Sequence, residues 1–409
     1  MEAIRATRPR PVAPRGPAVT ELRLSAFTSH RGAAFPLGPV TLFAGASGSG
    51  KSTALAAYEA LARLGAGATL DQVFPDPAAC VPERAPADAQ GRRGFRIGCT
   101  VEGPAGPVRL DLAVQAEPEL RIVGERLTGG GRTLLATALR DPGRRAVQAA
   151  WHTAGSVPVT RAPLPDDRLG TALLPLRVAG RTEGQLRVLA AAEQTVLALR
   201  SFFACDPQPH LMRLPVPRGQ GRLRRGCGNL AAVLDRTLEH RHSRCGARLA
   251  AAARAGCAGP VTELAVERFA DGTVRALLAR DASGARPATP VERLGEGELR
   301  YLALALVLLA GPGGPTGPGS PGIPGGPGGL GGAAGPGGAG PVAGDGAGPR
   351  PLTVLADGFD RCLDPRQRAE LLSLATAVCA AGGTRLVGTV TDASYARGAA
   401  GVTVVDLGP

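Results

Sequence analysis

The sequence has almost no lysine. It contains 409 residues, 47 of them lysine or arginine, yet lysine occurs only at position 51. With 34 acidic residues the formal net charge is +13, and arginine carries nearly all of the positive charge. In a chain that otherwise uses arginine throughout, a position that keeps lysine indicates a need for a compact ammonium group instead of a planar guanidinium. Lys51 is therefore the first residue to explain.

Aromatic residues, long apolar runs and closely spaced cysteines are also scarce. Aromatic residues make up 3% of the chain, so we expect a core of Leu, Val and Ala. The longest apolar run, 301–310, is too short to cross a bilayer, which favours a cytoplasmic protein without a membrane partner. The eight cysteines form no C-x-x-C pair, so reduced structural thiols are expected. His240 and His242 lie near Cys245 but lack a second ligand pair, which favours a solvated helix face over a metal site.

Two segments have the composition of disordered chain. Residues 1–18 are rich in Arg and Pro and lack the apolar stretch of a signal peptide, which predicts a disordered basic tail. Residues 311–350 contain 19 Gly and 9 Pro in 40 positions, too few side chains to offset the entropy lost on ordering. We expect this Gly/Pro-rich segment to be a disordered loop inserted between two elements of one domain.

Lys51 completes a glycine-rich loop between a strand and a helix. A half-buried strand is predicted over Thr20–Phe27, followed by a loop with His30 and Arg31 and a second strand over Val40–Ala44. That second strand runs into the sequence GASGSGKST, after which apolar residues recur at helical spacing. Strand, glycine loop and helix in this order are the context that a P-loop (Walker A) motif requires.

The chemistry of a P-loop assigns these residues to ATP and Mg²⁺. Gly45 and Gly50 allow backbone angles at which successive N–H groups point at phosphates, and the helix adds its positive N-terminus. The Lys51 ammonium reaches the β- and γ-phosphates, and the Ser52 hydroxyl ligates Mg²⁺. We therefore predict that the nucleotide is bound by Gly45, Ser47, Gly48, Ser49, Gly50, Lys51, Ser52 and Thr53.

A carboxylate follows a second apolar strand near the end of the chain. Leu352–Asp357 reads as a short buried strand whose Asp357 is placed to hold Mg²⁺ opposite Ser52. A helix over Pro365–Ala380 and strands over Arg385–Val390 and Val402–Leu407 follow. Alternating strands and helices around a P-loop predict an α/β core with a largely parallel sheet. We assign catalytic roles to Lys51 and Asp357.

The sequence Leu294-Gly295-Glu296-Gly297-Glu298 opens an apolar helix. Its acidic residues fit an ordinary helix N-terminus, where the dipole favours negative charge. The order of the motifs, however, resembles that of the ABC-type ATPases, specifically the RecF/SMC-like branch. The motifs are the P-loop, this segment, Asp357 and Leu363-Asp364. By this resemblance the chain is a predicted AAA-family ATP-binding protein. The resemblance implies that Leu294, Gly295, Glu296, Gly297 and Asp364 contact ATP, with the signature glycines acting across an ATP-dependent homodimer.

The resemblance also implies a domain organisation. Residues 19–310 and 351–409 would form one ATPase head, with an antiparallel lobe near its N-terminus. Within it, 19–65 carry the Walker A part, 66–290 an inserted helical and β region, 291–310 the signature helix and 351–409 the Walker B part. The inserted region shows a hairpin over 95–112, helices over 184–203 and 229–255, and a hairpin from 261–269 to 273–279.

Three positions depart from the family pattern. Gly295 stands where the signature usually has Ser, and Gly358 stands where a glutamate usually orients the attacking water. The switch histidine is absent, with Thr391 and Asp392 in its region. Loss of a general base typically removes about 10²–10⁴-fold in rate, so ATP binding should survive and turnover should be slow. Asp360 and Asp392 are the candidates to replace the missing glutamate.

Three functions fit these motifs. The first is a RecF/SMC-like ATPase whose ATP-dependent dimerisation gates contact with DNA or a partner protein. The second is a regulatory module that senses ATP with little hydrolysis. A transporter ATPase ranks last, because the P-loop and the signature lie too far apart. Arginines over 213–254 form either a phosphate-binding patch or a surface enriched in arginine by composition.

Overall fold

The computed structural model describes residues 16–153, 159–239, 244–281, 287–313 and 352–408. The predicted basic tail and the predicted Gly/Pro-rich loop fall almost wholly outside these ranges, as do His240 and His242. No helix within the described ranges combines the length and the apolar character needed to span a membrane.

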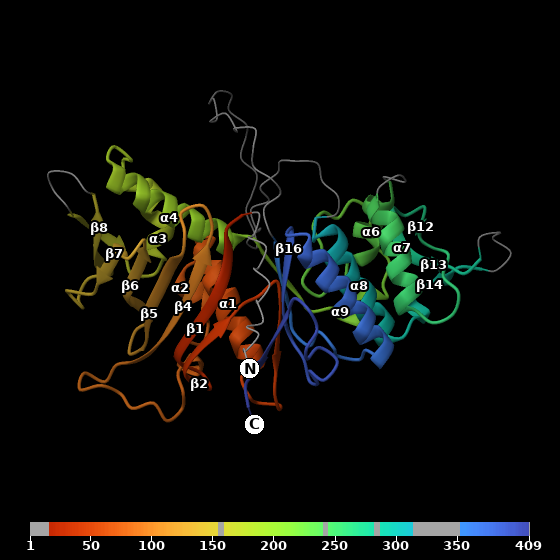
Figure 1. Cartoon of the computed structure of the whole chain (residues 1–409), viewed down its shortest axis with the longest axis horizontal. Helices are drawn as coiled ribbons and strands as arrows, with labels where there is room; N and C mark the ends of the chain where they lie inside the picture. The colour runs from red at the N-terminus through yellow and green to blue at the C-terminus, as the bar shows by residue number, and fades with distance from the viewer. Residues whose placement is uncertain (1–15, 154–158, 240–243, 282–286, 314–351, 409) are drawn as a thin grey trace, which may run out of the picture.

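An antiparallel sheet of eight strands forms one end of the molecule (Figure 1). Its strand order is β2-β1-β4-β5-β6-β7-β8-β9. The N-terminal pair is therefore extended by six strands from the inserted region, which the sequence indicated only for the β4–β5 hairpin. The strands are β1 (Ala18–Phe27), β2 (His30–Pro36), β4 (Arg93–Glu102), β5 (Val108–Glu117), β6 (Arg121–Gly129), β7 (Arg132–Ala138), β8 (Ala146–His152) and β9 (Val159–Pro165).

The predicted loop at His30 and Arg31 was wrong, because both residues begin β2. After a two-residue turn, β2 pairs antiparallel with β1, from Phe27 opposite His30 to Glu21 opposite Pro36. The segment hides its strand character because Gly32, Ala33 and Ala34 give no alternation of large apolar and polar residues. The segment is therefore a strand because it pairs with β1, and not because of its own residue pattern.

A parallel sheet of five strands holds the motifs, in the order β10-β15-β16-β3-β17. This is the largely parallel sheet that the alternation of strands and helices predicted. Its strands run within one residue of the predicted bounds where the sequence indicated them. They are β3 (Val40–Ala44), β10 (Phe202–Cys205), β15 (Leu352–Ala356), β16 (Thr384–Thr389) and β17 (Val402–Asp406).

Helices flank the parallel sheet, and a small third sheet closes the other end of the molecule (Figure 1). The region predicted as helical over 229–255 contains two helices, α6 and α7. The helices are α1 (Lys51–Gly65), α2 (Leu70–Val73), α3 (Gly170–Leu173), α4 (Glu183–Arg200), α5 (Pro209–Met212), α6 (Leu230–Glu239), α7 (Arg244–Gly256), α8 (Glu296–Ala310) and α9 (Pro365–Ala380). Short 3₁₀ turns lie at Ala78–Cys80, Leu174–Leu176 and Val291–Arg293, and the third sheet contains β11 (Val216–Pro217), β12 (Glu263–Arg268), β13 (Thr273–Ala279) and β14 (Thr289–Pro290).

Helix α1 lies between the two large sheets. It contacts β1 and β4 of the antiparallel sheet, β16 of the parallel sheet, and α4. Its buried residues, such as Tyr58 and Leu61, belong to the apolar core that the antiparallel sheet shares with α4. A second core surrounds α8 and α9 on the other side of the parallel sheet. The helix that begins at Lys51 is thus held on both sides, which fixes the start of the helix relative to both sheets.

The contact between α7 and α8 gives a test of the fold. Gly256 ends α7, and a Cβ there would overlap the buried ring of Tyr301. Alanine normally stabilises a helix by about 1 kcal/mol relative to glycine. We expect Gly256→Ala to destabilise this protein by about 1–3 kcal/mol, because overpacking dominates. Urea denaturation followed by circular dichroism measures the change. The control is Gly32→Ala, whose added Cβ meets nothing within 4 Å, and equal stability of the two variants would contradict the packing described here.

Candidate functional site

Three parallel strands end at the same edge of the sheet and bring the predicted metal ligands together. Asp357 follows β15, Thr389 ends β16, and Ser52 lies in the helix that follows β3. The Ser52 hydroxyl donates to Asp357 Oδ1 at 3.0 Å, and the Thr389 hydroxyl donates to the same oxygen at 2.6 Å. Ligands bind at this edge in open α/β sheets. The structure therefore places Ser52 beside Asp357, as the sequence predicted, although the two residues are 305 positions apart.

The glycine-rich loop between β3 and α1 is held open by left-handed backbone angles. Gly48 and Gly50 have φ of 84° and 93°, values that glycine adopts without strain. Lys51 Nζ donates to the carbonyl oxygens of Gly45 and Ala46, at 2.8 and 2.7 Å. An ammonium has three N–H groups, so these two bonds leave one donor. The lysine lies across the loop that precedes it.

A cavity of about 460 Å³ is lined by this loop and by the ends of β15 and β16. That volume is within the range of small-molecule sites. Gly45 and Ser49 do not line the cavity. They pack against each other within the loop, because a Cβ on Gly45 would lie 2.7 Å from Ser49 Oγ. The predicted site residues that do line it are Ser47, Gly48, Gly50, Lys51, Ser52, Thr53 and Asp357.

The cavity also has lining residues that the sequence reasoning missed. Thr28 and Ser29 come from the β1–β2 turn, and Thr389 comes from β16. Behind the loop, His30 Nε2 lies 3.0 Å from the carbonyl oxygen of Gly50. A Cβ on Gly50 would lie 2.6 Å from that nitrogen, so the turn and the loop are in close contact. The sequence did contain a signal for Thr389, because it is a hydroxyl residue at the end of a strand, β16, that pairs with β3.

An arginine covers the position after Asp357, where the ABC-type motif pattern that the sequence resembles has a glutamate. Gly358 has φ of 64°, and a Cβ there would lie 2.8 Å from Nε and 3.0 Å from Cζ of Arg361. Arg361 lines the cavity with Lys51, and its side chain is 53% exposed. A glutamate at 358 would need a strained backbone and displacement of the guanidinium. The missing carboxylate is thus replaced in space by a positive charge.

Asp206 lies between two arginines beside this position. It follows β10, whose Cys205 is paired with Ala356, so Asp206 and Asp357 end neighbouring strands. Its Oδ1 lies 3.7 Å from Arg300 and 3.8 Å from Arg361. Both separations are too long for a hydrogen bond, and the oxygen is buried without such a partner in the described part of the chain.

The buried Arg300 of α8 supports the backbone of the site from below. Its Nη2 donates to the carbonyl oxygen of Gly358 at 3.0 Å, and Arg300 is 3% exposed. Burial first, and then the charge of Arg361, lower the pKa of the Arg300 guanidinium. Through this residue the helix that begins at the predicted signature is joined to the turn after β15.

The predicted signature and Asp364 do not line the cavity. Gly295 is the N-cap of α8, and Gly297 packs so closely that a Cβ would overlap the carbonyl oxygen of Cys362. Asp364 is the N-cap of α9, where its Oδ1 accepts from the Gln367 N–H at 2.7 Å. None of the residues from 294 to 297 lines the cavity around Lys51. Within one chain the two parts of the predicted ATP site are separate.

Neither candidate replacement for the glutamate faces the cavity. Asp360 is 2% exposed, and its Oδ2 accepts from the N–H groups of Thr391 and Asp392, at 2.9 and 3.2 Å. The Asp392 carboxylate accepts from the N–H and hydroxyl of Ser394, both at 2.8 Å. Asp360 therefore braces the loop at Thr391 and Asp392, where a switch histidine was expected from the resemblance. Val390 and Thr391 are the residues of that loop that line the cavity.

Many arginines of the 213–254 segment are bound within the protein. Arg218 pairs with Asp235 at 3.0 Å, and Arg225 pairs with Glu59 at 2.8 Å. Arg213 donates to the Leu294 carbonyl at 2.9 Å, and Arg254 donates to that of Thr262 at 2.9 Å. These contacts favour the interpretation of arginine enriched by composition over a phosphate-binding patch. No group of three or more His, Cys, Asp or Glu side chains in the described ranges is placed to hold a metal.

No protein-family model matches the sequence, and no curated protein matches it. Solved structures do. Structures similar to this chain include SMC heads and RecF. These are the proteins whose motif order the sequence resembles.

An SMC head bound to the C-winged-helix domain of ScpA has a TM-score of 0.48, with 12% identity over 92% of this chain and 90% of that chain. The SMC head domain from Thermotoga maritima has a TM-score of 0.41, with 12% identity over 95% and 94%. RecF-ATP, a recombination mediator of the RecFOR pathway, has a TM-score of 0.21, with 16% identity over 29% of each chain. The likeness concerns the α/β fold with its antiparallel and parallel sheets.

The Thr389 hydroxyl gives a test of the site geometry. It donates to Asp357 and accepts from the Gly358 N–H at 2.7 Å. Thr389→Val would leave the Gly358 N–H without its partner and would remove one of the two hydroxyl donors to Asp357 Oδ1, at a cost of about 1–3 kcal/mol. Chemical denaturation should show this loss, and Thr389→Ser, which keeps the hydroxyl, should retain more of the stability. Equal loss in both variants would mean that the methyl group, not the hydroxyl, matters.

Proposed function

We propose that the chain binds ATP with Mg²⁺ in the cavity around Lys51 and hydrolyses it slowly. The observation that carries the proposal is the meeting of Ser52 and Asp357 at the edge of the parallel sheet, at 3.0 Å. A hydroxyl and a carboxylate are the two protein ligands that hold Mg²⁺ beside a P-loop. Mg²⁺ takes its remaining ligands from water and phosphate oxygens, so two protein oxygens suffice.

The loop, Lys51, Thr389 and Arg361 each have a role in this proposal. The N–H groups of the loop and the N-terminus of α1 receive the phosphates, and Lys51 exchanges its bonds to Gly45 and Ala46 for the β- and γ-phosphates. Thr389 orients the Asp357 carboxylate. Arg361 lies within the same cavity as Lys51, where a guanidinium pairs with the terminal phosphate.

Slow hydrolysis follows from the turn after β15. Phosphoryl transfer to water needs a group that orients the water, because the protein does little covalent chemistry. Gly358 supplies no side chain, Arg361 cannot accept a proton, and Asp360 is bound to the loop at Thr391. The nucleotide-sensing alternative, in which ATP is held with little turnover, is favoured by this same arrangement.

An ATP-dependent homodimer is part of the proposal. Residues Leu294 to Gly297 lie outside the cavity of their own chain, so the N-terminus of α8 can reach a bound nucleotide only from a second copy. In such a dimer the helix N-terminus would receive the γ-phosphate, and Asp364 would lie near the same interface. Dimer formation would then gate contact with DNA or a partner protein.

Nucleotide binding is tested with labelled ATP and Mg²⁺ on purified chain. The wild type should bind, and Lys51→Ala should lose affinity by at least tenfold, because a charge-assisted contact to the phosphates is worth roughly 1.5–3 kcal/mol. Asp357→Asn should lose the dependence on Mg²⁺ while retaining part of the affinity. Lack of ATP binding by the folded wild type would refute the proposal.

The dimer is tested at Gly295, where an added Cβ comes no closer than 3.6 Å to another residue. Gly295→Asp supplies a favoured N-cap residue and keeps the helix, yet its carboxylate would repel the γ-phosphate. Gly295→Ser supplies the hydroxyl that the family signature has. Light scattering with ATP should show less dimer for Gly295→Asp and more for Gly295→Ser. Identical dimerisation of both variants and the wild type would reject the sandwich arrangement.

The cause of slow turnover is tested by restoring the glutamate. Gly358→Glu alone should not accelerate hydrolysis, because its Cβ would meet the guanidinium of Arg361. Gly358→Glu combined with Arg361→Ala should raise kcat by at least about tenfold, a small part of what a general base contributes. Gly358→Ala with Arg361→Ala is the matched control. Rapid turnover by the wild type, abolished by Lys51→Ala, would overturn the slow-hydrolysis part.

A further inference from the structure

Two buried cysteines lie side by side at the end of strand β10. The sulfur atoms of Cys205 and Cys227 are 3.8 Å apart, and the two residues are 1% and 0% exposed. Both are free thiols. Within the described ranges no other two cysteine sulfurs make such a contact. The proposed ATP site around Lys51 uses neither thiol, so this pair needs its own explanation.

The backbone holds the two cysteines together. The Asp206 N–H donates to the carbonyl oxygen of Arg225 at 2.9 Å. The residue after Cys205 is therefore bound to a residue two positions before Cys227, although the cysteines are 22 positions apart. The sulfur atoms of a disulfide are about 2.05 Å apart, so a closure of about 1.8 Å from the observed 3.8 Å completes the bond.

The backbone of Cys227 has a conformation that favours glycine. Its φ is 57°, a left-handed value that is uncommon for a residue with a side chain. Gly226 and Gly228 flank it, in a chain that contains 59 glycines. Glycine at this position would adopt the turn without strain. A thiol that occupies a strained position indicates that the side chain itself has a use.

Cys205 has a route to solvent through a small side cavity. It lines a space of about 60 Å³ together with Ser52, Asp357 and Arg225. One water needs about 10–15 Å³ of such volume, so the side cavity admits a molecule as small as hydrogen peroxide. The Arg225 side chain at its border is 59% exposed. Cys227 does not line the side cavity, so Cys205 is the thiol that meets an oxidant first.

We propose that Cys205 and Cys227 form a reversible disulfide when the protein meets a peroxide. The Cys205 thiolate attacks one oxygen of hydrogen peroxide, which breaks the O–O bond and gives a sulfenic acid and hydroxide. The Cys227 thiol then attacks the Cys205 sulfur, which forms the S–S bond and releases the sulfenic oxygen as water. In total, two thiols and one hydrogen peroxide give one disulfide and two waters. A dithiol reductant reverses the reaction by thiol–disulfide exchange.

Proximity, not reactivity, selects this pair of thiols. The hydrogen bond to Cys227, and then burial, raise the pKa of the Cys205 thiol. Because the thiolate is the reactive form, the first step should be slow, and the adjacent Cys227 should capture its product. Cys362 is the opposite case. It is exposed, and its sulfur lies 3.8 Å from the Glu296 carboxylate, with no second cysteine sulfur in contact within the described ranges.

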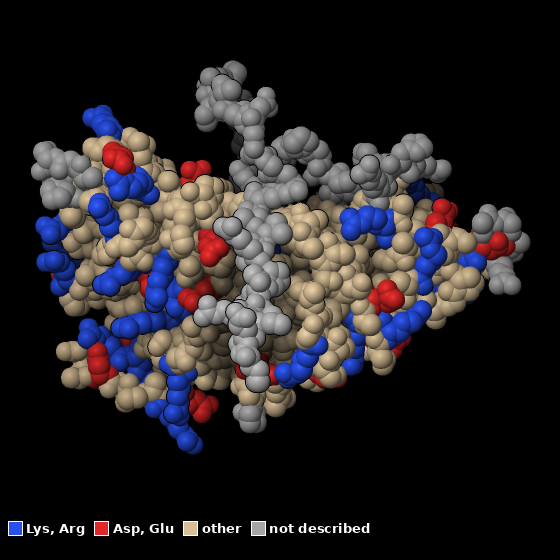
Figure 2. All heavy atoms as spheres, in the orientation of Figure 1, with Lys and Arg blue, Asp and Glu red and all other residues tan. Residues whose placement is uncertain are grey.

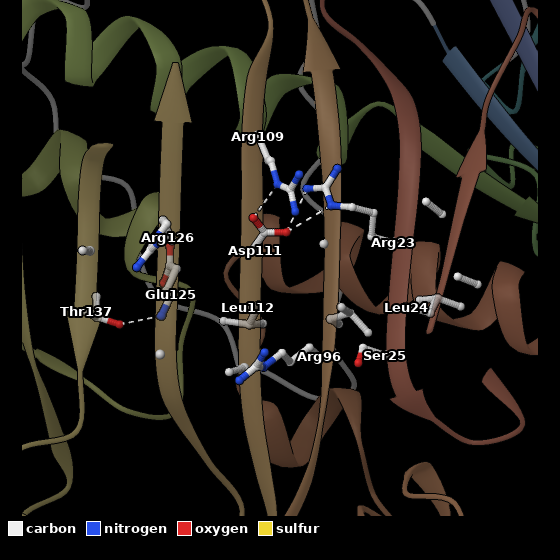
Figure 3. Close-up of a pocket in the computed structure, with 17 residues that line it drawn as sticks. Arg23, Leu24, Ser25, Arg96, Arg109, Asp111, Leu112, Glu125, Arg126 and Thr137 are labelled. Atoms are coloured by element: carbon white, nitrogen blue, oxygen red, sulfur yellow. Dashed lines mark hydrogen bonds and ion pairs between the residues drawn. The ribbon is translucent and has the colours of Figure 1, made fainter. Parts of the chain in front are cut away.

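Cys99 of β4 is a buried thiol for comparison. The outer face of its sheet carries Arg96 and Arg126 (Figure 3), and in Figure 2 basic side chains gather over this end of the molecule. Cys99 follows Arg96 by three residues, so its side chain lies on the opposite face, in the core. Burial raises the pKa of the Cys99 thiol to about 12. Cys99 thus resembles Cys205 in burial but has no sulfur neighbour in the described part of the chain.

The test is peptide mapping of the purified chain after exposure to hydrogen peroxide without nucleotide. Trypsin cleaves after arginine, so Cys205 falls in the peptide 201–213 and Cys227 in the peptide 226–236, each with one cysteine. Mass spectrometry without reduction should find these two peptides joined. The free thiols of the denatured protein should fall by two from the original eight, and dithiothreitol should restore them.

Cys227→Gly removes the second thiol and suits the left-handed backbone, so this variant should fold. Peroxide should then give no joined peptides, and dimedone should trap the sulfenic acid of Cys205. The matched control, Cys99→Ala, should still give the joined peptides. Their absence from the wild type, at a peroxide concentration that oxidises Cys362, would overturn the proposal. Equal amounts of cross-links to Cys99 would also overturn it, because they would show oxidation of unfolded chain.

Bound Mg²⁺ and ATP should slow the oxidation, an expectation that rests on the proposed function. The proposed Mg²⁺ ligands Ser52 and Asp357 line the side cavity through which peroxide reaches Cys205. With ATP at ten times its Kd, about one-eleventh of the protein is free, so joining should slow by about tenfold. Lys51→Ala should form the disulfide without this protection. Equal rates in wild type saturated with ATP would overturn the protection, whereas failure of ATP binding would leave the nucleotide-free test of the disulfide unaffected.

Discussion

The site depends on one carboxylate oxygen. Asp357 Oδ1 accepts from Ser52 and from Thr389, and so joins the ends of three parallel strands that arrive from distant parts of the sequence. The strand order places β16 between β15 and β3, which is why the hydroxyl between loop and carboxylate comes from Thr389. A carboxylate with two hydroxyl donors keeps its orientation without a bound ion. The same edge of the sheet also fixes the start of α1, because α1 begins at Lys51, one residue before Ser52.

Next to that fixed carboxylate, a positive charge lies where the motif pattern that the sequence resembles has a negative one. The position of a glutamate holds Gly358, and its space holds the guanidinium of Arg361. Beneath it, Arg300 binds the Gly358 carbonyl. A site with positive groups around the terminal phosphate stabilises bound ATP, while the water has no base to orient it. In the proposed function, strong retention of ATP and slow turnover would therefore both follow from Gly358 and its neighbour Arg361.

The sequence predicted what is determined locally and missed what depends on pairing. The glycine loop, Lys51 and the helix over 365–380 were predicted because each is specified by consecutive residues with known turn or capping chemistry. The place of Asp357 beside Ser52 was predicted only through the motif. Strand β2 was missed because its identity comes from β1. The side chain of Arg361 over Gly358 was also missed, because local sequence does not give the direction of a long side chain at a turn.

The same argument explains why the arginines had to be sorted by structure. In sequence, the arginines from 213 to 225 form the densest cluster, yet Asp235 and Glu59 bind Arg218 and Arg225 from distant elements. Arg96 and Arg126 are thirty positions apart in sequence, and only the β4-β5-β6 register brings them to one face. A charge is available to an anionic partner when no acid is opposite it, and strand pairing decides which residues are opposite. In a chain enriched in arginine throughout, unpaired charge on a shared face is therefore a better indicator of a binding surface than the density of arginine along the sequence.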